Sequence, residues 1–550
     1  MNQVIFDANK FNVNFKTKEL LEMEAFNNFL SDYYKEYFPN VNFEKNDLIP
    51  DFSSALGFLK DIYNHDEKTL KAIRNSSQAI KDDVLNYIDS LYDYYRRLTR
   101  FLVFVKDGKK YISHKDLIAD FNALSNSVVT CYREIYEIVL NGEQTVYRVL
   151  PSGANAAVLL NKNEINQPKD FEFLKDIPLL EAIVTQPPFI IKTKQNKRVG
   201  LFFEQNHYVT SKDFDYKNAY GVLVKIYNTT GLVYFDKEFL GYLVALGNLF
   251  QIESYDPNKN NKIDFIVLFG TNNDENQCYY YYKEKMLVGV MPKKANIDYF
   301  GYVKKIMLTL FNLKMIEKKL LPIHGAGIKI TSKGKTKNFF ILGDSGAGKS
   351  ETIEAIKHLY GSNYRIDTIF DDMGTFHLKD QQVYATGTEI GAFVRLDDLD
   401  QGYSLRSIDR AVFFNIDETN SRVVIPIETY EMTYDFHHVD AFLLADNYSD
   451  SFQGIKFFND SKTAKDEFIL GKRVALNTTQ EKGLVSTYFA NPFGPVQKKE
   501  VVDTYLNEYF ETLFKNSIPV GKIFTRLSLD RKEGPYTGAK ALINLFEQLN

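Results

Sequence analysis

The 550-residue chain contains no tryptophan and only two cysteines, Cys131 and Cys278. Two cysteines are too few for a disulfide framework, and neither lies in a motif typical of a catalytic thiol. We therefore expect both to be buried thiols in a reducing compartment. The sequence also lacks an apolar run of about 18 residues, the length that a membrane-spanning helix requires. Its best candidate, residues 239–250, is shorter and follows three charged residues.

An excess of charge of either sign is missing as well. The 67 basic and 71 acidic residues nearly cancel to a net charge of −4, so the composition gives no electrostatic footprint for nucleic acid. Residues 1–7 lack the basic start and apolar core of a secretion signal. We expect a soluble, cytoplasmic protein that binds neither nucleic acid nor membranes, and the oligomeric state stays open.

The length and the 44% apolar content suffice for several domains with sizeable cores. Residues 15–100 carry apolar positions at three- and four-residue spacing, which predicts helices. From about Phe101 the pattern changes to short β-rich runs, such as residues 264–269 and 279–282, before a helical pattern over 299–313. We expect an α/β protein in three parts: a mainly helical extension over residues 1–140, and two α/β domains over 141–300 and 301–550.

The run from 343 to 350 fits the pattern G-x-x-x-x-G-K-[ST] of a phosphate-binding loop (P-loop). A strand pattern over 338–342 precedes it, and a helical pattern over 351–359 follows it. The glycines let backbone N–H groups approach phosphate, Lys349 can reach the outer phosphates, and Ser350 can hold a divalent cation. The residues predicted to contact the nucleotide are Gly343, Asp344, Ser345, Gly346, Ala347, Gly348, Lys349 and Ser350.

An acidic pair follows the loop. The strand pattern of residues 366–370 runs into Asp371 and Asp372. A lone acidic pair at a strand end is usually a solvated turn. After a phosphate loop at this distance, however, it is typical of carboxylates that hold Mg²⁺ directly or through water. We predict that both aspartates are metal ligands.

Four blocks in this order resemble the phosphoenolpyruvate carboxykinases of the ATP-dependent type: residues 299–305, residues 321–324, the phosphate loop and the acidic pair. The resemblance covers roughly residues 180–545, and its further blocks are residues 264–267, 419–427, 481–483 and 489–494. It implies a two-domain carboxykinase-like fold with the phosphate loop in the C-terminal domain, to which the helical extension is added.

The resemblance also implies a set of metal ligands. In that family the residues matching Lys305, His324 and Asp372 ligate Mn²⁺, and the hydroxyl matching Ser350 holds the Mg²⁺ of the nucleotide. A lysine can ligate a metal only when it is deprotonated. Burial and nearby cations favour this state because they lower the pKa of the lysine.

The implied reaction is decarboxylation of oxaloacetate and phosphorylation of the resulting enolate by ATP, which gives phosphoenolpyruvate, ADP and carbon dioxide. Lys349 and Arg422 would stabilise the transferred phosphoryl group, which requires mostly positioning and electrostatics. Tyr299 and Lys304 would orient the carboxylate or carbon dioxide, and Lys305 belongs to the same catalytic group.

The sequence departs from the carboxykinase pattern at several positions. Asp344, Ala347 and Glu351, with His324 upstream, also resemble the bacterial HPr kinase/phosphorylase, a protein kinase built on a related nucleotide-binding core. Lys482 stands where carboxykinases place a nucleotide-contacting arginine, which leaves the nucleotide preference open.

The substrate-binding arginine of the family's N-terminal domain has no clear counterpart here. Arg148 and Arg198 both stay open as candidates. Two alternatives to the carboxykinase also stay open: a kinase for a protein or another small molecule, and a nucleotide-sensing protein without turnover. The physiological direction of the reaction and the role of residues 1–140 are open as well.

Overall fold

The computed structural model divides the chain into two units, Met1–Gln144 and Thr145–Asn550. Both combine helices with strands, so the protein is of the mixed α/β class, as expected. No described helix is both long enough and apolar enough to cross a membrane. The structure describes all residues except 1–2, 8–16, 44–46, 98, 104–113, 142–145, 149–155, 162–168, 186–188, 200–201, 254, 256–261, 397–409, 428, 451–452, 477–481, 532 and 550.

The first unit is mainly helical, as the apolar spacing of residues 15–100 predicts. The expected strand near Phe101 is present as β2 (Thr99–Val103), but it pairs in parallel with β1 (Gln3–Asp7). The mixed α/β region does not begin at Phe101, because β2 pairs with the N-terminal strand of the same unit and the next element described is a long helix, residues 114–140. The helices are α1 (Thr17–Leu20), α2 (Glu24–Glu36), α3 (Phe52–Tyr63), α4 (Glu67–Arg74), α5 (Gln78–Arg97) and α6 (His114–Leu140).

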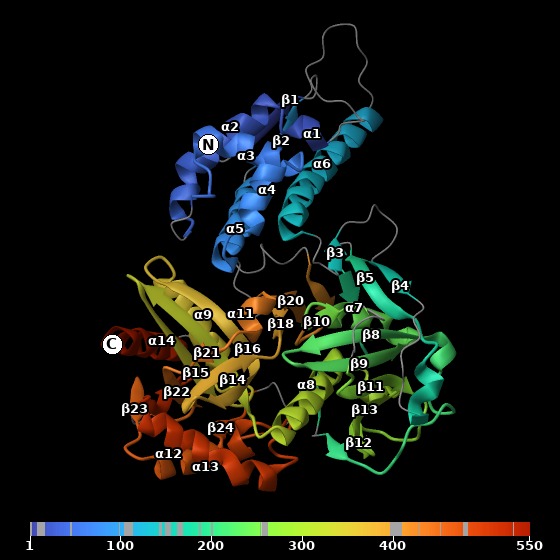
Figure 1. Cartoon of the computed structure of the whole chain (residues 1–550), viewed down its shortest axis with the longest axis vertical. Coiled ribbons are helices and arrows are strands. Elements are labelled where there is room, and N and C mark those ends of the chain that lie inside the picture. The colour runs from blue at the N-terminus through green and yellow to red at the C-terminus, as the bar shows by residue number, and fades with distance from the viewer. Residues whose placement is uncertain are drawn as a thin grey trace. The chain divides into compact units, whose positions relative to one another are not determined.

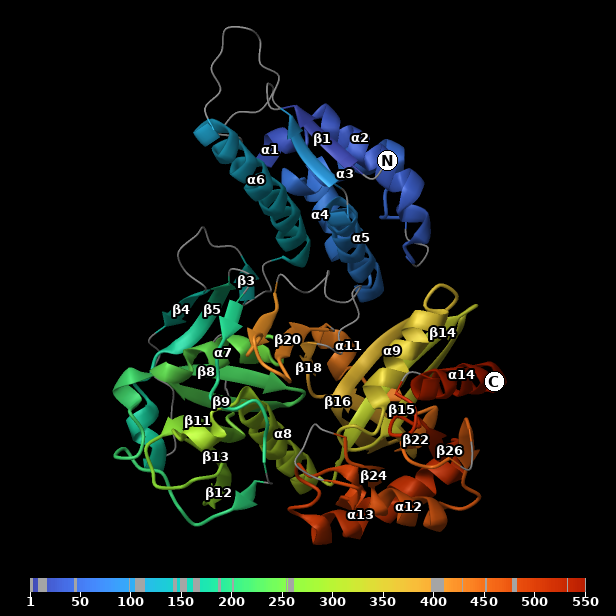
Figure 2. The same cartoon turned by 180° about the vertical axis from the view of Figure 1, so that it is seen from behind.

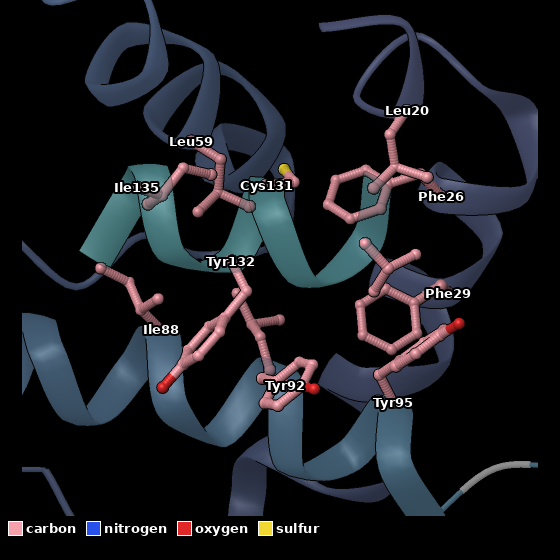
Figure 3. Close-up of a pocket in the computed structure, with 12 residues that line it drawn as sticks. Leu20, Phe26, Phe29, Leu59, Ile88, Tyr92, Tyr95, Cys131, Tyr132 and Ile135 are labelled. Atoms are coloured by element: carbon pink, nitrogen blue, oxygen red, sulfur yellow. The ribbon is translucent and has the colours of Figure 1, made fainter. Parts of the chain in front are cut away.

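The helices of the first unit surround a small apolar cavity of about 70 Å³ (Figure 3). Phe29 of α2, Leu59 of α3 and Cys131 of α6 line it. Tyr92 and Tyr132 stack beside it with ring centroids 4.2 Å apart. None of the described side chains that line the cavity is charged, so it is not a candidate for the phosphate chemistry that the sequence predicts.

The second unit contains two large sheets. In the first, β11 lies between β9 and β13 and is parallel to both. The buried strands β9 and β11 are covered on both faces. The order along the sheet is β3 (Val146–Arg148), β5 (Leu179–Thr185), β8 (Ala219–Ile226), β9 (Thr229–Asp236), β11 (Phe265–Thr271), β13 (Met286–Pro292), β12 (Tyr279–Lys283) and β7 (Phe203–Glu204), with β4 (Ala156–Asn161) on β5 and β10 (Gln251–Glu253) on β8.

The second large sheet carries the predicted phosphate loop. Its central strand β14 pairs with β15 on one side and β16 on the other, antiparallel to both. The order is β21 (His437–His438), β17 (Gln382–Gly387), β16 (Arg365–Lys379), β14 (Leu321–Ser332), β15 (Lys335–Leu342), β22 (Ala441–Asp446), β26 (Val520–Phe524) and β23 (Ile455–Phe457).

Helices cover both faces of this second sheet (Figures 1 and 2). Successive residues of a strand point to opposite faces. Accordingly, Phe339 and Ile341 pack with α9 (Lys349–Tyr360) and α14 (Glu533–Gln548), whereas Phe340 and Leu342 pack with α12 (Ser461–Leu470) and α13 (Lys499–Lys515). The part of β15 that leads into the loop is therefore buried on both faces.

Helix α8 (Phe300–Glu317) joins the two large sheets, since it packs on β13 of the first and β14 of the second (Figure 1). It is buried along nearly its whole length, Lys304 included. The boundary expected near residue 300 coincides with its start, but the division of residues 145–550 into two domains stays a prediction. The smaller elements are the sheet β18 (Gly391–Arg395), β20 (Arg422–Pro426), β19 (Val412–Phe414) and β6 (Phe189–Ile191), the hairpin β24 (Lys472–Val474) and β25 (Leu484–Ser486), and helices α7 (Leu240–Leu246) and α11 (Tyr430–Tyr434).

Candidate functional site

The glycine-rich loop lies between strand β15 and helix α9, the strand-loop-helix order that the sequence predicts. Gly346 and Gly348 have φ of 81° and 90°, values that residues with a side chain rarely adopt. A Cβ on Gly348 would also lie 2.6 Å from Thr525 Cβ, and one on Gly343 would lie 2.8 Å from Ala347 Cβ. The loop therefore requires glycine at these positions for its shape, before any ligand is considered.

Two side chains at the start of α9 face the acidic pair or the loop itself. Lys349 is 6% exposed, and its Nζ donates a hydrogen bond to the carbonyl of Asp344 at 3.3 Å. Ser350 Oγ donates to Asp371 Oδ1 at 2.8 Å. Burial raises the pKa of Asp371, although the Ser350 hydroxyl opposes this effect. Ser350 and Asp371 thus stand together at the helix N-terminus, where a helix favours anions.

The acidic pair lies inside strand β16 and not at its end, which corrects the expected strand of residues 366–370. Strand β16 runs on to Lys379, and Asp371 and Asp372 pair with Ala326 and Gly325 of β14. Asp372 has φ of 142°, a strained conformation for a residue with a side chain. Strain of this kind persists only where the surroundings impose it, and it gathers at functional sites.

Asp372 is the centre of the polar cluster. Its Oδ2 accepts from Lys305 Nζ at 2.6 Å and lies 2.7 Å from Lys304 Nζ, and its Oδ1 lies 3.0 Å from His324 Nε2. Burial alone would raise the pKa of Asp372, but the two lysines and the histidine hold it well below its usual value. The structure therefore brings Lys305, His324 and Asp372 together, as expected of one coordination sphere.

His324 is fully buried, and both of its ring nitrogens face oxygen atoms. Nδ1 lies 3.0 Å from the carbonyl oxygen of Ala490, and Nε2 lies 3.0 Å from Asp372 Oδ1. Burial lowers the pKa of His324, which favours the neutral ring with a single N–H group. In one of the two contacts, a ring nitrogen without a hydrogen then faces an oxygen atom, and their lone pairs repel each other. A cation between Nε2 and Asp372 would remove this repulsion, so the donor set fits a metal ion.

The two lysines of α8 have different surroundings. Lys304 lies between Asp372 and Glu389, whose Oε1 is 2.9 Å from Nζ. Burial would lower the pKa of Lys304, but the two carboxylates outweigh it and raise the pKa. For Lys305, burial lowers the pKa to about 8 although Asp372 opposes it. Lys304 therefore stays cationic, whereas Lys305 can offer the neutral nitrogen that a metal ligand requires.

Arg198 reaches this cluster, whereas the side chain of Arg148, on β3, lies outside the described residues. The Arg198 guanidinium lies 4.9 Å from the centre of the Phe493 ring, and Lys305 Nζ lies 4.6 Å from the same ring. Burial lowers the pKa of Arg198, while Asp344 and other nearby anionic groups oppose it. Of the two open candidates, Arg198 is the one that the structure brings to the site.

Tyr299 and Arg422 complete the site on the side of the small sheet. Tyr299 lies at the N-terminus of α8 and is 5% exposed. Both side chains lie against Phe393 of β18: the Tyr299 ring is 5.7 Å from it, and the Arg422 guanidinium is 5.8 Å from its centre. Burial raises the pKa of Tyr299, although Arg422, Arg198 and Lys304 oppose the shift. The phenol thus stands among three cations.

Three residues of the site escape sequence analysis, and the predicted nucleotide contact Lys482 stays a prediction. Glu389 and Arg473 carried no recognisable signal, and Phe493 was noted only as part of a resembling block. Arg473 is 2% exposed and donates to Asp344 Oδ2 at 3.0 Å. Lys482, the predicted nucleotide contact, is exposed in the connection between β24 and β25.

The usual metal ligands His, Cys, Asp and Glu do not by themselves make up a complete ligand set at this site. Within the described part of the chain, no cluster of three or more His, Cys, Asp or Glu side chains could hold a metal. The cluster here offers two such ligands, His324 and Asp372, and needs the amine of Lys305 as the third. In comparisons with known proteins, no family profile matches the chain and no curated protein is significantly similar to it.

Proposed function

We propose that the protein is an ATP-dependent phosphoenolpyruvate carboxykinase-like enzyme, which converts oxaloacetate and ATP to phosphoenolpyruvate, ADP and carbon dioxide. One observation carries the proposal. Two consecutive aspartates connect the glycine loop, through Ser350, with the cluster of Lys304, Lys305 and His324. A triphosphate and a second anionic substrate could therefore be held against neighbouring cations.

The loop side of the site would bind the nucleotide. Its backbone N–H groups and the N-terminus of α9 favour phosphate, and Lys349 needs only to leave the carbonyl of Asp344 to reach it. Ser350 and Asp371 are the groups that would hold Mg²⁺, because a hydroxyl and a carboxylate are the oxygen ligands that this ion prefers. Lys482, which is exposed, is the remaining side chain that we propose to contact the nucleotide.

Lys305, His324 and Asp372 would hold Mn²⁺. Bound there, the ion would supply a Lewis acid beside the enolate oxygen of the substrate. The protein's part is to keep three different ligands within reach of each other in a buried place. Asp372 supplies the negative charge, His324 a ring nitrogen, and Lys305 a nitrogen whose pKa burial lowers to about 8.

The remaining cations would bind the carboxylates of oxaloacetate and the moving phosphoryl group. Arg198 lies near Tyr299, and Lys304 stays charged between two carboxylates. Arg422 would join Lys349 in neutralising the equatorial oxygens of the phosphoryl group. A substrate with two carboxylates suits a buried site with this many positive groups.

A kinase similar to HPr kinase/phosphorylase is the second candidate. The observation that favours it is Asp344, which stands in a loop that is threonine-rich in carboxykinases and which is buried against Arg473 in this chain. Such an enzyme would phosphorylate a protein or another small molecule through the same loop and the same acidic pair. In either case the two free, buried cysteines suit the cytoplasmic location that we propose.

The test is an assay of phosphoenolpyruvate formation. Purified protein receives oxaloacetate, Mg²⁺ and Mn²⁺ with either ATP or GTP, and Lys349→Met serves as the inactive control. We expect product with at least one nucleotide and none with the variant. Absence of product in every combination, together with hydrolysis or transfer of the γ-phosphate, would move the assignment to the kinase.

A further inference from the structure

Asp344 makes contacts that the proposed reaction does not use. The residue is 6% exposed, and its Oδ2 accepts hydrogen bonds from Arg473 Nη2 at 3.0 Å and Thr487 Oγ1 at 3.2 Å. Its Oδ1 accepts from the backbone N–H of Ser345 at 2.7 Å and lies 3.4 Å from His324 Nδ1. One carboxylate of the loop therefore touches both the hairpin that carries Arg473 and the predicted cation site.

Arg473 belongs to a segment that runs beside the glycine loop. We call residues 471–476 and 482–491 the flanking segment; it contains β24 and β25. Asn447 joins the segment to the loop: its Nδ2 donates to the carbonyls of both Gly346 and Val474 at 2.9 Å, and its Oδ1 accepts from the N–H of Val474 at 2.9 Å. Hydrogen bonds of the Asn447 side-chain amide therefore link the loop to the flanking segment, in addition to the ion pair between Arg473 and Asp344.

The flanking segment also reaches His324 at its other end. The carbonyl of Ala490 lies 3.0 Å from His324 Nδ1. Phe489 and Ala490 have φ of 50° and 47°, in the left-handed region that costs free energy for residues other than glycine. At Gly471 a Cβ would lie 2.1 Å from the carbonyl oxygen of Thr487. The chain therefore retains strain and close packing where this segment meets the histidine.

We propose that Asp344 and Arg473 are positioning residues that couple occupancy of the glycine loop to occupancy of the cation site. The imidazole of His324 is a rigid ring that contacts Asp344 and Ala490 through Nδ1 and Asp372 through Nε2. A nucleotide that orders the loop also fixes Asp344, and Asp344 then holds the His324 ring in the position that a cation at Nε2 requires. By thermodynamic linkage, the cation raises the affinity for the nucleotide by the same factor. This inference rests on the proposed nucleotide and cation sites, but not on the carboxykinase reaction itself.

The experiment measures binding and not turnover. The full chain is titrated with the non-hydrolysable nucleotide AMP-PNP by calorimetry, in a large excess of Mg²⁺, with and without a smaller amount of Mn²⁺. We expect Mn²⁺ to raise the affinity of the unchanged chain for the nucleotide about tenfold. Arg473→Met and Asp344→Asn should each reduce this effect to about twofold or less, and the double variant should lose no more than either alone.

Arg365→Met is the matched control, because it also removes an arginine that pairs with an aspartate, Asp367, on β16. It should keep the full effect of Mn²⁺. Thermal unfolding of every variant separates positioning from packing: loss of stability with an unchanged Mn²⁺ effect would make the pair purely structural and overturn the inference.

Three further outcomes are decisive. If Arg473→Met fails to fold, Asp344→Asn and Arg473→Lys carry the test, and an undiminished Mn²⁺ effect in both overturns the inference. If the unchanged chain binds nucleotide and Mn²⁺ independently, the coupling is absent while the two proposed sites stand. Binding of neither overturns the proposed function together with the inference.

Discussion

At the scale of single residues, Asp372 holds three potentially cationic groups with one carboxylate. The distances from its two oxygens to Lys305, Lys304 and His324 are 2.6, 2.7 and 3.0 Å. An asparagine at this position would carry a neutral amide, which accepts hydrogen bonds more weakly than a carboxylate and cannot balance the charge of the lysines. We therefore expect the function of this cluster to depend on Asp372 more than on any of its neighbours.

Asp372→Asn should therefore lower phosphoenolpyruvate formation by roughly 100-fold or more and weaken Mn²⁺ binding. Steady-state kinetics and electron paramagnetic resonance of free Mn²⁺ measure the two effects. Asp367→Asn is the control on the same strand, since Asp367 bonds Arg365 outside the cluster. Equal losses in both variants would mean that β16 is damaged as a whole and would refute a specific role for Asp372.

A buried histidine outside the site makes the stability of the protein depend on pH. His377 Nε2 lies 2.9 Å from Thr386 Oγ1, and the ring lies between Tyr227 and Phe436 at 5.1 and 5.0 Å. Burial, assisted by Lys318, lowers the pKa of His377 from 6.5 to about 4. Between these two values the unfolded chain binds a proton that the folded chain does not, so acid favours unfolding.

Over that window His377 should cost the folded state about 3 kcal/mol as the pH falls from 6.5 to 4. His377→Gln should flatten this part of the stability profile, which urea unfolding at several pH values measures. The exposed His65→Gln is the control and should leave the slope unchanged. A slope that persists in His377→Gln would assign the acid sensitivity to other groups.

Sequence alone identifies many of the residues in this site: the glycine loop and the acidic pair through their spacing, and His324 and the two lysines through the resemblance to the carboxykinases. The glycine loop, the acidic pair, His324 and the two lysines are all named from motifs, and the structure brings them together. Glu389 and Arg473 could not be found in this way. Each is a charged residue on a strand or its flank and outside any motif, and only folding shows that it is buried against the cluster.

At the scale of elements, the turn from β15 to α9 depends on backbone conformations that only glycine adopts freely. Gly348 combines a φ of 90° with a distance of 2.6 Å from its Cβ position to Thr525 Cβ. Thr525 in turn donates a hydrogen bond to the carbonyl of Ala347 at 2.7 Å, so it cannot move away without releasing the loop.

Gly348→Ala should therefore weaken nucleotide binding by at least about tenfold, because the loop must distort. Calorimetric titration with AMP-PNP measures the change. Gly334→Ala is the matched control: Gly334 has φ of 80°, but its Cβ position has no heavy atom within 4 Å. Similar losses in both variants would show that backbone strain, and not the contact with Thr525, explains the effect.

Elements with a strong local pattern were predicted well, and those defined by distant partners were not. The strand and helix around the loop, and helix α8 near residues 299–313, follow from periodicity. The continuation of β16 past Asp372 did not follow, because its pairing with β14 and β17 outweighs the weak strand propensity of two aspartates. Long-range pairing also explains why β2 belongs to the first unit.

At the scale of the whole molecule, every residue placed in the site comes from the unit Thr145–Asn550. The helical unit Met1–Gln144 has its own core, with residues such as Leu30, Tyr33 and Tyr87 fully buried among its own helices. The division expected at residue 140 lies close to the division between these units. The boundary expected near residue 300 coincides with the start of α8, which packs on both large sheets, and it stays a prediction.

The chain of residues 145–550, expressed without the helical unit, should fold and retain nucleotide binding within a few-fold of the full chain. Calorimetry with AMP-PNP and thermal unfolding provide the measurements, and the full chain carrying Lys349→Met gives the level without binding. Loss of the folded state in the shortened chain would show that the helical unit supplies part of the stability of the second unit.

The position of the acidic pair within β16 has one more consequence. Consecutive Cα atoms in a trans chain are about 3.8 Å apart, and hydrogen bonds to β14 hold Asp371 and Asp372 in register. The separation of the two Cα atoms that carry the carboxylates is therefore set by covalent geometry and by the pairing of the strand. A motion of the elements around the site would change what approaches the two aspartates, but the spacing of their backbone positions would stay the same as long as β16 remains paired with β14.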